Sequence, residues 1–245
     1  MPPKSQKSKV SSTTSRSNRN QGSTTPQKPV EIQFPAFATK RGLECRVLLQ
    51  DQILLIDNFM TQSECQNFVK FIDSLPLELT PRKRPGEAER VNHRFSVSSP
   101  EFAEELHKRL LPHLPSFPYP ASTRKTQTVD PRLPNSCNSN IRVYKYTPSQ
   151  LFGPHYDDSV RDPQSGHTSE WTLLIYLTGH EDGIKGGETI FYKDGKGRNR
   201  DSVVAPLTRG TALLHRHGNE CLLHEGSPVE SGTKYVLRSD LMFAK

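Results

Sequence analysis

Residues 211–243 read TALLHRHGNECLLHEGSPVESGTKYVLRSDLMF, and this stretch contains three short β-type runs separated by turn residues. Four similar runs lie between residue 141 and this stretch. Seven strands are therefore predicted: Ile141–Tyr146, Trp171–Leu177, Glu188–Tyr192, Ser202–Ala205, Thr211–Leu214, Cys221–His224 and Lys234–Phe243. Short strands at such spacing are typical of a β-sandwich or a β-barrel.

Elements of another kind precede these strands. After a strand-like run, Val47–Ile56, Thr61 and Glu64 have the spacing of a capping box. The helix that they start carries apolar residues at near-helical spacing: Cys65, Phe68, Val69, Ile72 and Leu75. A second helix is predicted after Ser99, with Pro100 at its first position and an inward face of Phe102, Leu106, Leu110 and Leu111. Helices followed by strands indicate an α+β fold, with the helices on one face of the sheet.

Two segments between these elements are long and polar. They are Thr80–Arg94, between the two helices, and Pro115–Asn140, before the first strand of the β-rich region. Loops of this length in a compact domain are usually functional lids or disordered, and both alternatives stay open.

The first 34 residues differ in composition from the rest of the chain. Residues 1–30 contain six basic side chains and no acidic one, whereas the remainder contains 27 basic and 26 acidic side chains. With almost nothing apolar to bury, residues 1–34 are predicted to be a disordered basic tail, followed by one folded domain over 35–245. The tail fits a nuclear-localisation or partner-binding arm, a solubilising tail or, less well, a transit peptide.

Composition also limits the class of protein. No apolar run is long enough to span a membrane, and the N-terminus lacks an apolar signal sequence. Four scattered cysteines form no metal-binding pair and are interpreted as reduced thiols, so a cytoplasmic or nuclear protein is expected. Because the folded part is nearly neutral, nucleic acid is an unlikely partner except through the basic tail.

A candidate metal site begins at His155 and Asp157. Two residues apart at a predicted strand end, the imidazole and the carboxylate point to the same side. Such a pair is weak by itself, since His180 and Asp182 form another. The first pair gains weight from His224 downstream, because two imidazoles and one carboxylate are the facial triad of non-haem Fe(II) oxygenases.

The spacing of further motifs makes the interpretation more specific. In order along the chain they are Tyr146, His155 and Asp157, Tyr176-Leu177, Gly186-Gly187-Glu188-Thr189, His224 and Lys234, with Asp57–Ile72 as an additional match upstream. Over about residues 141–243 the sequence resembles the catalytic domain of the prolyl 4-hydroxylase-like 2-oxoglutarate/Fe(II) dioxygenases. In that family the second pair, His180 and Asp182, falls in a variable loop, which indicates a solvated turn.

The resemblance implies a double-stranded β-helix, or jelly roll, with an iron-binding core at about residues 141–245. It implies that His155, Asp157 and His224 bind the iron and that Lys234 pairs with the 2-oxoglutarate carboxylate. Tyr146 and Thr189 are expected to hydrogen-bond near this co-substrate, with ordinary strand packing as the alternative.

Arg238 departs from the collagen-type members of the family. It shares a predicted strand face with Lys234, so it is expected to help hold 2-oxoglutarate, to contact substrate or to replace Lys234. The spacing from His224 favours Lys234 over Arg238 as the partner of the 2-oxoglutarate carboxylate. Other polar neighbours are expected to support the site or face solvent: Asp158, His215, His217 and Glu225.

The implied activity is hydroxylation of a C–H bond with Fe(II), 2-oxoglutarate and O₂, and ascorbate as reductant. The favoured substrate is a prolyl residue of an intracellular protein. The alternatives are a free amino acid or small metabolite, or a methylated nucleic acid undergoing demethylation, which would need a basic groove. A binding module without activity would have lost a ligand, and a zinc hydrolase would leave Lys234 without a role. Polar residues 86–94 suit a substrate rim, whereas Arg82-Lys83-Arg84 is interpreted as a solvated loop. The substrate itself and the oligomeric state are not predicted.

Overall fold

The computed structural model describes residues 32–117, 132–193 and 201–244. By its internal contacts the chain divides after Gln33, and Phe34–Lys245 forms one unit. The predicted tail, residues 1–34, lies almost entirely outside the described residues, as does the middle of the predicted loop Pro115–Asn140. None of the helices within the described ranges has the length and apolar character needed to cross a membrane.

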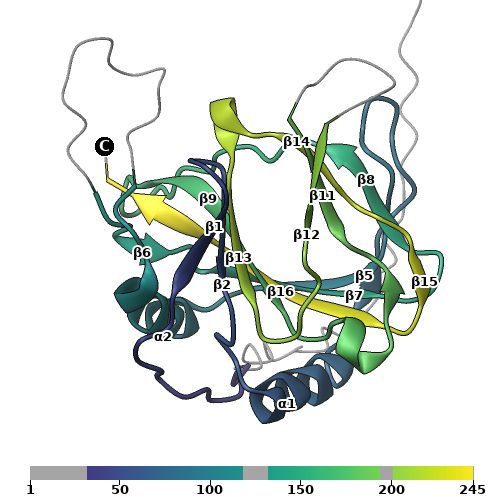
Figure 1. Ribbon diagram of the computed structural model, residues 1–245, viewed down its shortest axis with the longest axis horizontal. Helices are drawn as coiled ribbons and strands as arrows, with labels where there is room; N and C mark the ends of the chain where they lie inside the picture. The colour runs from purple at the N-terminus through teal and green to yellow at the C-terminus, as the bar shows by residue number, and fades with distance from the viewer. Residues whose placement is uncertain (1–31, 118–131, 194–200, 245) are drawn as a thin grey trace, which may run out of the picture. The chain divides into compact units, whose positions relative to one another are not determined.

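Two antiparallel sheets face each other in Phe34–Lys245 (Figure 1). The larger sheet is ordered β1 (Cys45–Leu49), β2 (Ile53–Ile56), β13 (Ala212–Arg216), β9 (Thr168–Tyr176), β16 (Lys234–Phe243), β7 (Asn140–Tyr146), β5 (His93–Ser98) and β3 (Glu78–Leu79), and β6 (Ser136–Cys137) also pairs with β16. The smaller sheet is ordered β12 (Ser202–Ala205), β11 (Thr189–Tyr192), β14 (Leu223–Gly226), β8 (Leu151–His155) and β4 (Arg90–Val91). A short pair, β10 (Lys185–Gly186) and β15 (Val229–Ser231), lies beside them.

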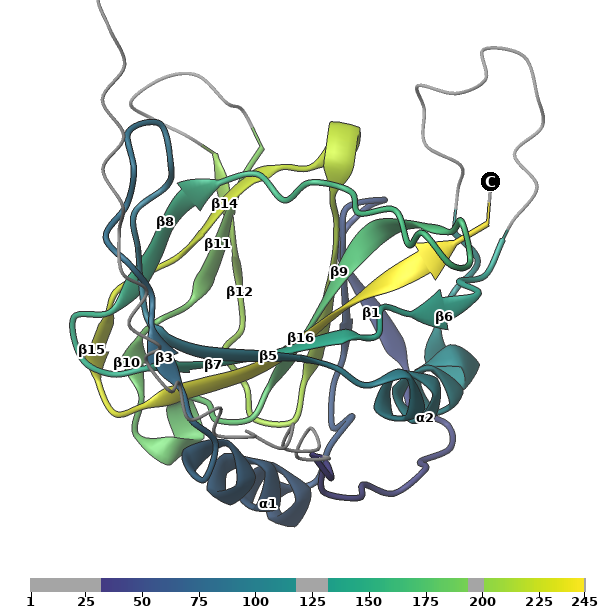
Figure 2. The same cartoon turned by 180° about the vertical axis from the view of Figure 1, so that it is seen from behind.

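Both α-helices lie on the outer face of the larger sheet, away from the smaller one (Figures 1 and 2). Helix α1 (Gln62–Asp73) begins with the predicted capping box, since the Thr61 hydroxyl accepts from the Glu64 amide and the Glu64 carboxylate accepts from the Thr61 amide. Helix α2 (Pro100–Leu110) has Ser99 as its N-cap. The predicted helices are confirmed, and the fold is a double-stranded β-helix with few helices, as expected.

The alternation of side chains along the larger sheet produces two cores. One face of its central strands packs on the helices, where Val143, Ile175 and Leu237 meet apolar residues of α1 and α2. The other face points between the sheets, where Tyr144 and Val236 meet Phe191 of the smaller sheet. Burial on both faces leaves every residue of β16 buried, including the polar Lys234, Arg238 and Asp240.

Three predicted segments differ from the structure. The run Val47–Ile56 is a hairpin of β1 and β2, because Asp51 adopts a left-handed conformation (φ 55°) and reverses the chain. The predicted loop Thr80–Arg94 contains β4 and the start of β5, and Pro115–Asn140 contains β6. These strands are short or polar on one face, so their apolar alternation is too brief to predict them.

Candidate metal and co-substrate site

Two histidines face each other across neighbouring strands of the smaller sheet. His155 ends β8 and His224 lies in β14, where the two residues are direct register partners with ring centroids 4.2 Å apart. Each ring places its Nδ1 2.9 Å from a backbone carbonyl two residues earlier, that of Gly153 and that of Leu222. A carbonyl can only accept, so each Nδ1 carries the proton and each Nε2 keeps its lone pair for a metal.

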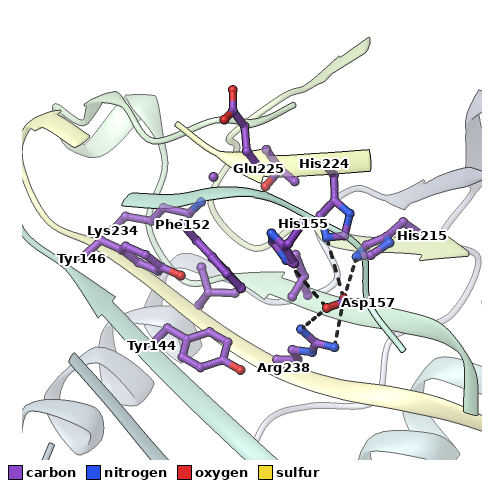
Figure 3. Close-up of a pocket in the computed structure, with 14 residues that line it drawn as sticks. Tyr144, Tyr146, Phe152, His155, Asp157, His215, His224, Glu225, Lys234 and Arg238 are labelled. Carbon is purple, nitrogen blue, oxygen red and sulfur yellow. Dashed lines mark hydrogen bonds and ion pairs between the residues drawn. The ribbon is translucent and has the colours of Figure 1, made fainter. Parts of the chain in front are cut away.

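Asp157 completes this group immediately after β8 (Figure 3). Its Oδ1 is 3.7 Å from Nε2 of His155, and its Oδ2 is 3.8 Å from Nε2 of His224. The donor atoms of the three residues lie within 4.8 Å of one another. Two neutral imidazoles and one carboxylate on one side of a cavity are a donor set that fits a divalent iron.

Arg238 reaches Asp157 from β16 of the larger sheet. Its guanidinium donates to Oδ1 at 3.1 Å and forms an ion pair with Oδ2 at 2.9 Å, and Thr172 donates to Oδ2 at 2.9 Å. Burial disfavours the charged form of Asp157, but the surrounding groups, with the Arg238 cation foremost, together hold the pKa of that carboxyl well below its usual range. The carboxylate therefore stays ionised, and Arg238 is engaged with it.

Lys234 lies on the same strand and lines the same cavity. Its ammonium is buried and donates to the carbonyl of Gly187 at 2.6 Å. Burial lowers the pKa of Lys234 to about 8, because Glu188 compensates the charge only in part. A buried ammonium with a single carbonyl acceptor suits an anionic ligand such as a 2-oxoglutarate carboxylate, so the residues present fit this co-substrate.

The motif Gly186-Gly187 has a steric reason in this arrangement. Gly187 adopts φ +77°, and a Cβ there would lie 3.1 Å from Val229 and 3.4 Å from the Lys234 side chain. Glycine allows its carbonyl to reach the ammonium.

The remaining predicted co-substrate residues also line this cavity. Tyr146 is the register partner of Lys234 on β7, and its ring centroid is 5.5 Å from the Lys234 ammonium. Thr189 begins β11, and its hydroxyl lies 2.7 Å from the Tyr176 hydroxyl. One predicted neighbour of the site, Asp158, is exposed, while another, Glu225, accepts from the Tyr192 hydroxyl at 2.5 Å.

His215 lies closer to the site than the sequence interpretation suggested. It belongs to β13, which extends beyond the predicted strand Thr211–Leu214, is buried, and its Nε2 is 3.7 Å from Oδ2 of Asp157 without a hydrogen-bond partner. If the predicted strand is extended beyond Leu214, His215 lies on the same face as Leu213, and this alternation could have predicted its inward position. His217 follows the strand and contacts two hydroxyls at 2.9 Å, those of Thr172 and Ser169.

The second His-x-Asp pair lies elsewhere. Residues 180–182 form an exposed 3₁₀ turn after β9, in which Asp182 pairs with Arg209. The prediction of a solvated turn is confirmed.

Comparisons with known proteins agree with this geometry. The family model of the 2OG-Fe(II) oxygenase superfamily matches residues 141–239. Prolyl 4-hydroxylase 1 of Arabidopsis thaliana is 25% identical over 199 residues, which cover 75% of this chain and 66% of that protein. The chain therefore spans slightly less than two thirds of this relative.

Solved structures agree with the fold. A prolyl-4-hydroxylase of Pseudomonas putida matches with a TM-score of 0.50 at 12% identity, over 79% of this chain and 94% of that one. A prolyl hydroxylase of Trichoplax adhaerens, solved with a hypoxia-inducible-factor peptide fragment, matches with a TM-score of 0.50 at 14% identity, over 79% and 84%. The donors of the site converge in one cavity between two facing sheets, residues 141–239 match the 2OG-Fe(II) oxygenase superfamily, and the chain is prolyl 4-hydroxylase-like.

Proposed function

We propose that the protein is an Fe(II)- and 2-oxoglutarate-dependent dioxygenase that hydroxylates a prolyl residue of another protein. The observation that carries this proposal is the lining of one cavity by two imidazoles, a carboxylate and a buried ammonium: His155, His224, Asp157 and Lys234. The match to the superfamily model implies Fe(II), 2-oxoglutarate and O₂, and ascorbate is consistent with prolyl hydroxylases. The bound iron and co-substrate would supply the oxidation, in which the substrate C–H bond is hydroxylated while 2-oxoglutarate is converted to succinate and CO₂.

In this proposal the side chains of the chain itself bind and orient. His155, Asp157 and His224 hold the metal, and the Nδ1–carbonyl hydrogen bonds keep both rings neutral and correctly turned. Lys234 pairs with the distal carboxylate of 2-oxoglutarate. Arg238 keeps Asp157 ionised and fixed, a role that its contacts favour over direct binding of the co-substrate.

The prolyl substrate rests on a narrower basis. The Arabidopsis relative is a prolyl 4-hydroxylase, and the matched motifs are those that sequence reasoning assigned to the same group. A protein or peptide is accordingly the proposed partner.

Anaerobic reconstitution with Fe(II) and 2-oxoglutarate tests the proposal directly. The loaded native protein should show the visible metal-to-ligand charge-transfer band, and His224→Ala should abolish it, because one of three ligands is lost. His180→Ala is the matched control, since it removes the histidine of the exposed His-x-Asp pair and should keep the band.

Succinate release with proline-containing peptides and with small metabolites then identifies the substrate class. An absent band in the native protein, or an undiminished band in His224→Ala, would contradict the iron assignment. Turnover with metabolites alone would contradict the prolyl substrate.

A further inference from the structure

The mouth of the site opens into a cleft of about 990 Å³ that is strongly cationic. Seven basic side chains line it, against three acidic ones, Glu87, Asp157 and Asp158. Beyond residue 30 the chain carries 27 basic and 26 acidic side chains, so the positive charge at the cleft is a local concentration. The run Arg82-Lys83-Arg84, interpreted from sequence as a solvated loop, lies along the rim of this cleft.

Strand register explains how the floor of the cleft becomes basic. Arg238 on β16 is the partner of Arg142 on β7, and Arg94 on β5 is the partner of Tyr144, two residues along β7. Directly paired residues and residues two apart share one face of a sheet, so these arginines lie on the face that carries the site. They form a series that leads from Asp157 outward.

The arginines of this series have fewer acidic partners the farther they lie from Asp157. Arg238 pairs with both Asp157 and Asp240, and Arg142 pairs with Asp240. The exposed side chain of Arg94 has no ion pair or hydrogen bond with any residue in the described ranges. Arg94 and Arg142 also line an adjoining hollow of about 520 Å³, which extends the basic surface along β5 and β7.

We propose that this cleft binds an acidic peptide segment, whose aspartate or glutamate side chains flank the residue that is hydroxylated. The inference rests on the proposed function, and it adds the charge class of the substrate. A cation without an internal partner beside a reaction site provides complementarity for a carboxylate, and this complementarity selects among peptides more than it adds affinity.

Nucleic acid fits the same cleft less well. Binding of single strands needs aromatic side chains that are free to stack on bases. Among the residues that line the cleft, Tyr156 is the exposed aromatic, at 58%. Phe152 is occupied, since it stacks on His155 with ring centroids 3.5 Å apart and lies 4.4 Å from the Arg90 guanidinium.

Peptide binding can be measured without turnover. Three labelled peptides share a central proline and differ only in flanking Glu, Gln or Lys residues, and each is titrated anaerobically into the full-length protein loaded with Fe(II) and 2-oxoglutarate. Fluorescence anisotropy should show the Glu peptide binding most tightly, with an affinity that falls as salt is added. Arg94→Glu should weaken the Glu peptide about fivefold to tenfold and strengthen the Lys peptide, because a compensating charge is replaced by a repelling one.

Two further variants separate the cleft from general charge. Lys83→Glu alters an exposed loop at the rim and should also weaken the Glu peptide. Lys70→Glu makes the same charge change on exposed α1, which covers the opposite face of the larger sheet, and should leave the three affinities unchanged. The charge-transfer band of each sample reports that the site is loaded.

Equal affinities for the three peptides, or no measurable binding of the Glu peptide, would overturn the inference. So would a single-stranded oligonucleotide that displaces the Glu peptide and itself supports 2-oxoglutarate consumption. A Glu peptide that binds selectively but is never hydroxylated would instead count against the proposed prolyl hydroxylation, so the two failures are distinguishable.

Discussion

The smaller sheet supplies the two histidines of the site, whereas the larger sheet supplies the cations around it. His155 and His224 are adjacent in register, and each is oriented by a carbonyl only two residues away. Arg238 and Lys234 come from one long strand and act across the gap between the sheets, on Asp157 and on the Gly187 carbonyl. The histidine rings are thus oriented by carbonyls close to them in the chain, whereas the cations act through contacts between elements of different sheets.

The largest expected effect concerns the ion pair that joins the two sheets. Replacing Arg238 by Gln leaves Asp157 buried without a full charge partner, so the free energy of unfolding should fall by about 3–5 kcal/mol. Urea denaturation of the metal-free protein measures this loss. Arg94→Gln, on the same sheet but exposed, should change it by less than about 0.5 kcal/mol. Equal losses would show that the Arg238 pair does not stabilise the packing of the sheets.

Lys234 tests whether the larger sheet also holds the co-substrate. Lys234→Met should weaken 2-oxoglutarate binding by at least about 30-fold, since a buried charge pair is lost. Thr189→Val, a change on the smaller sheet that removes one hydroxyl, should weaken it by about tenfold at most. Anaerobic titration of the charge-transfer band gives both constants. A loss of affinity in Thr189→Val as large as that in Lys234→Met would contradict the prediction that the larger sheet provides the main contact for 2-oxoglutarate.

The pKa of Lys234 adds a pH dependence to this binding. Burial lowers the pKa of Lys234 to about 8, so the ammonium is charged below pH 8 and neutral above it. The dissociation constant of 2-oxoglutarate should be flat below about pH 8 and rise about tenfold per pH unit above it.

The same shift has a stability consequence. The pKa of Lys234 in the folded protein lies below the ordinary value of 10.5, so burial of the charge destabilises the ligand-free fold below pH 8, and this penalty fades between pH 8 and 10.5. Lys234→Arg should remove the dependence of 2-oxoglutarate binding over this range. A native profile that stays flat through pH 9 would contradict the predicted role of Lys234.

The smallest expected effect compares two histidines at the end of β13. Nε2 of His215 is buried without a partner, so His215→Phe should change the stability of the metal-free protein by less than about 1 kcal/mol. His217 contacts two buried hydroxyls, and His217→Phe should cost about 1–3 kcal/mol because those groups lose a partner. Thermal denaturation compares the variants. The reverse order would mean that His215 has the more important structural contacts.

The contrast between the sheets also marks the reach of sequence reasoning. His155, Asp157 and His224 could be proposed from the sequence because they occupy positions of the motif pattern that the chain shares with the family, although His155 and His224 lie on strands far apart in the chain. Arg238 and Asp157 are 81 positions apart in the chain. Their contact depends on the twist and register of the strands, which cannot be deduced from this spacing. Lys234 and Arg238 were expected on one face, but only the three-dimensional arrangement separates their contacts.

The basic series on the cleft floor was missed for a similar reason. Arg94 lay in a segment predicted to be a loop, because β4 and the polar, half-exposed β5 offer little apolar alternation. Net charge gave no signal either, since acidic residues elsewhere in the chain balance the cleft. A local charge excess becomes visible only when residues from several strands are placed on one surface.

The packing of His155 has a consequence for how the protein acquires metal. Its ring is held on one face by Phe152, which in turn lies under Arg90, and its Nδ1 is held by the Gly153 carbonyl. The side chain of His155 therefore loses its conformational entropy when the protein folds, and not when the metal binds. Chelation should then leave the fold intact, unlike in a zinc finger, and an apoprotein folded before iron becomes available should be able to take it up without refolding.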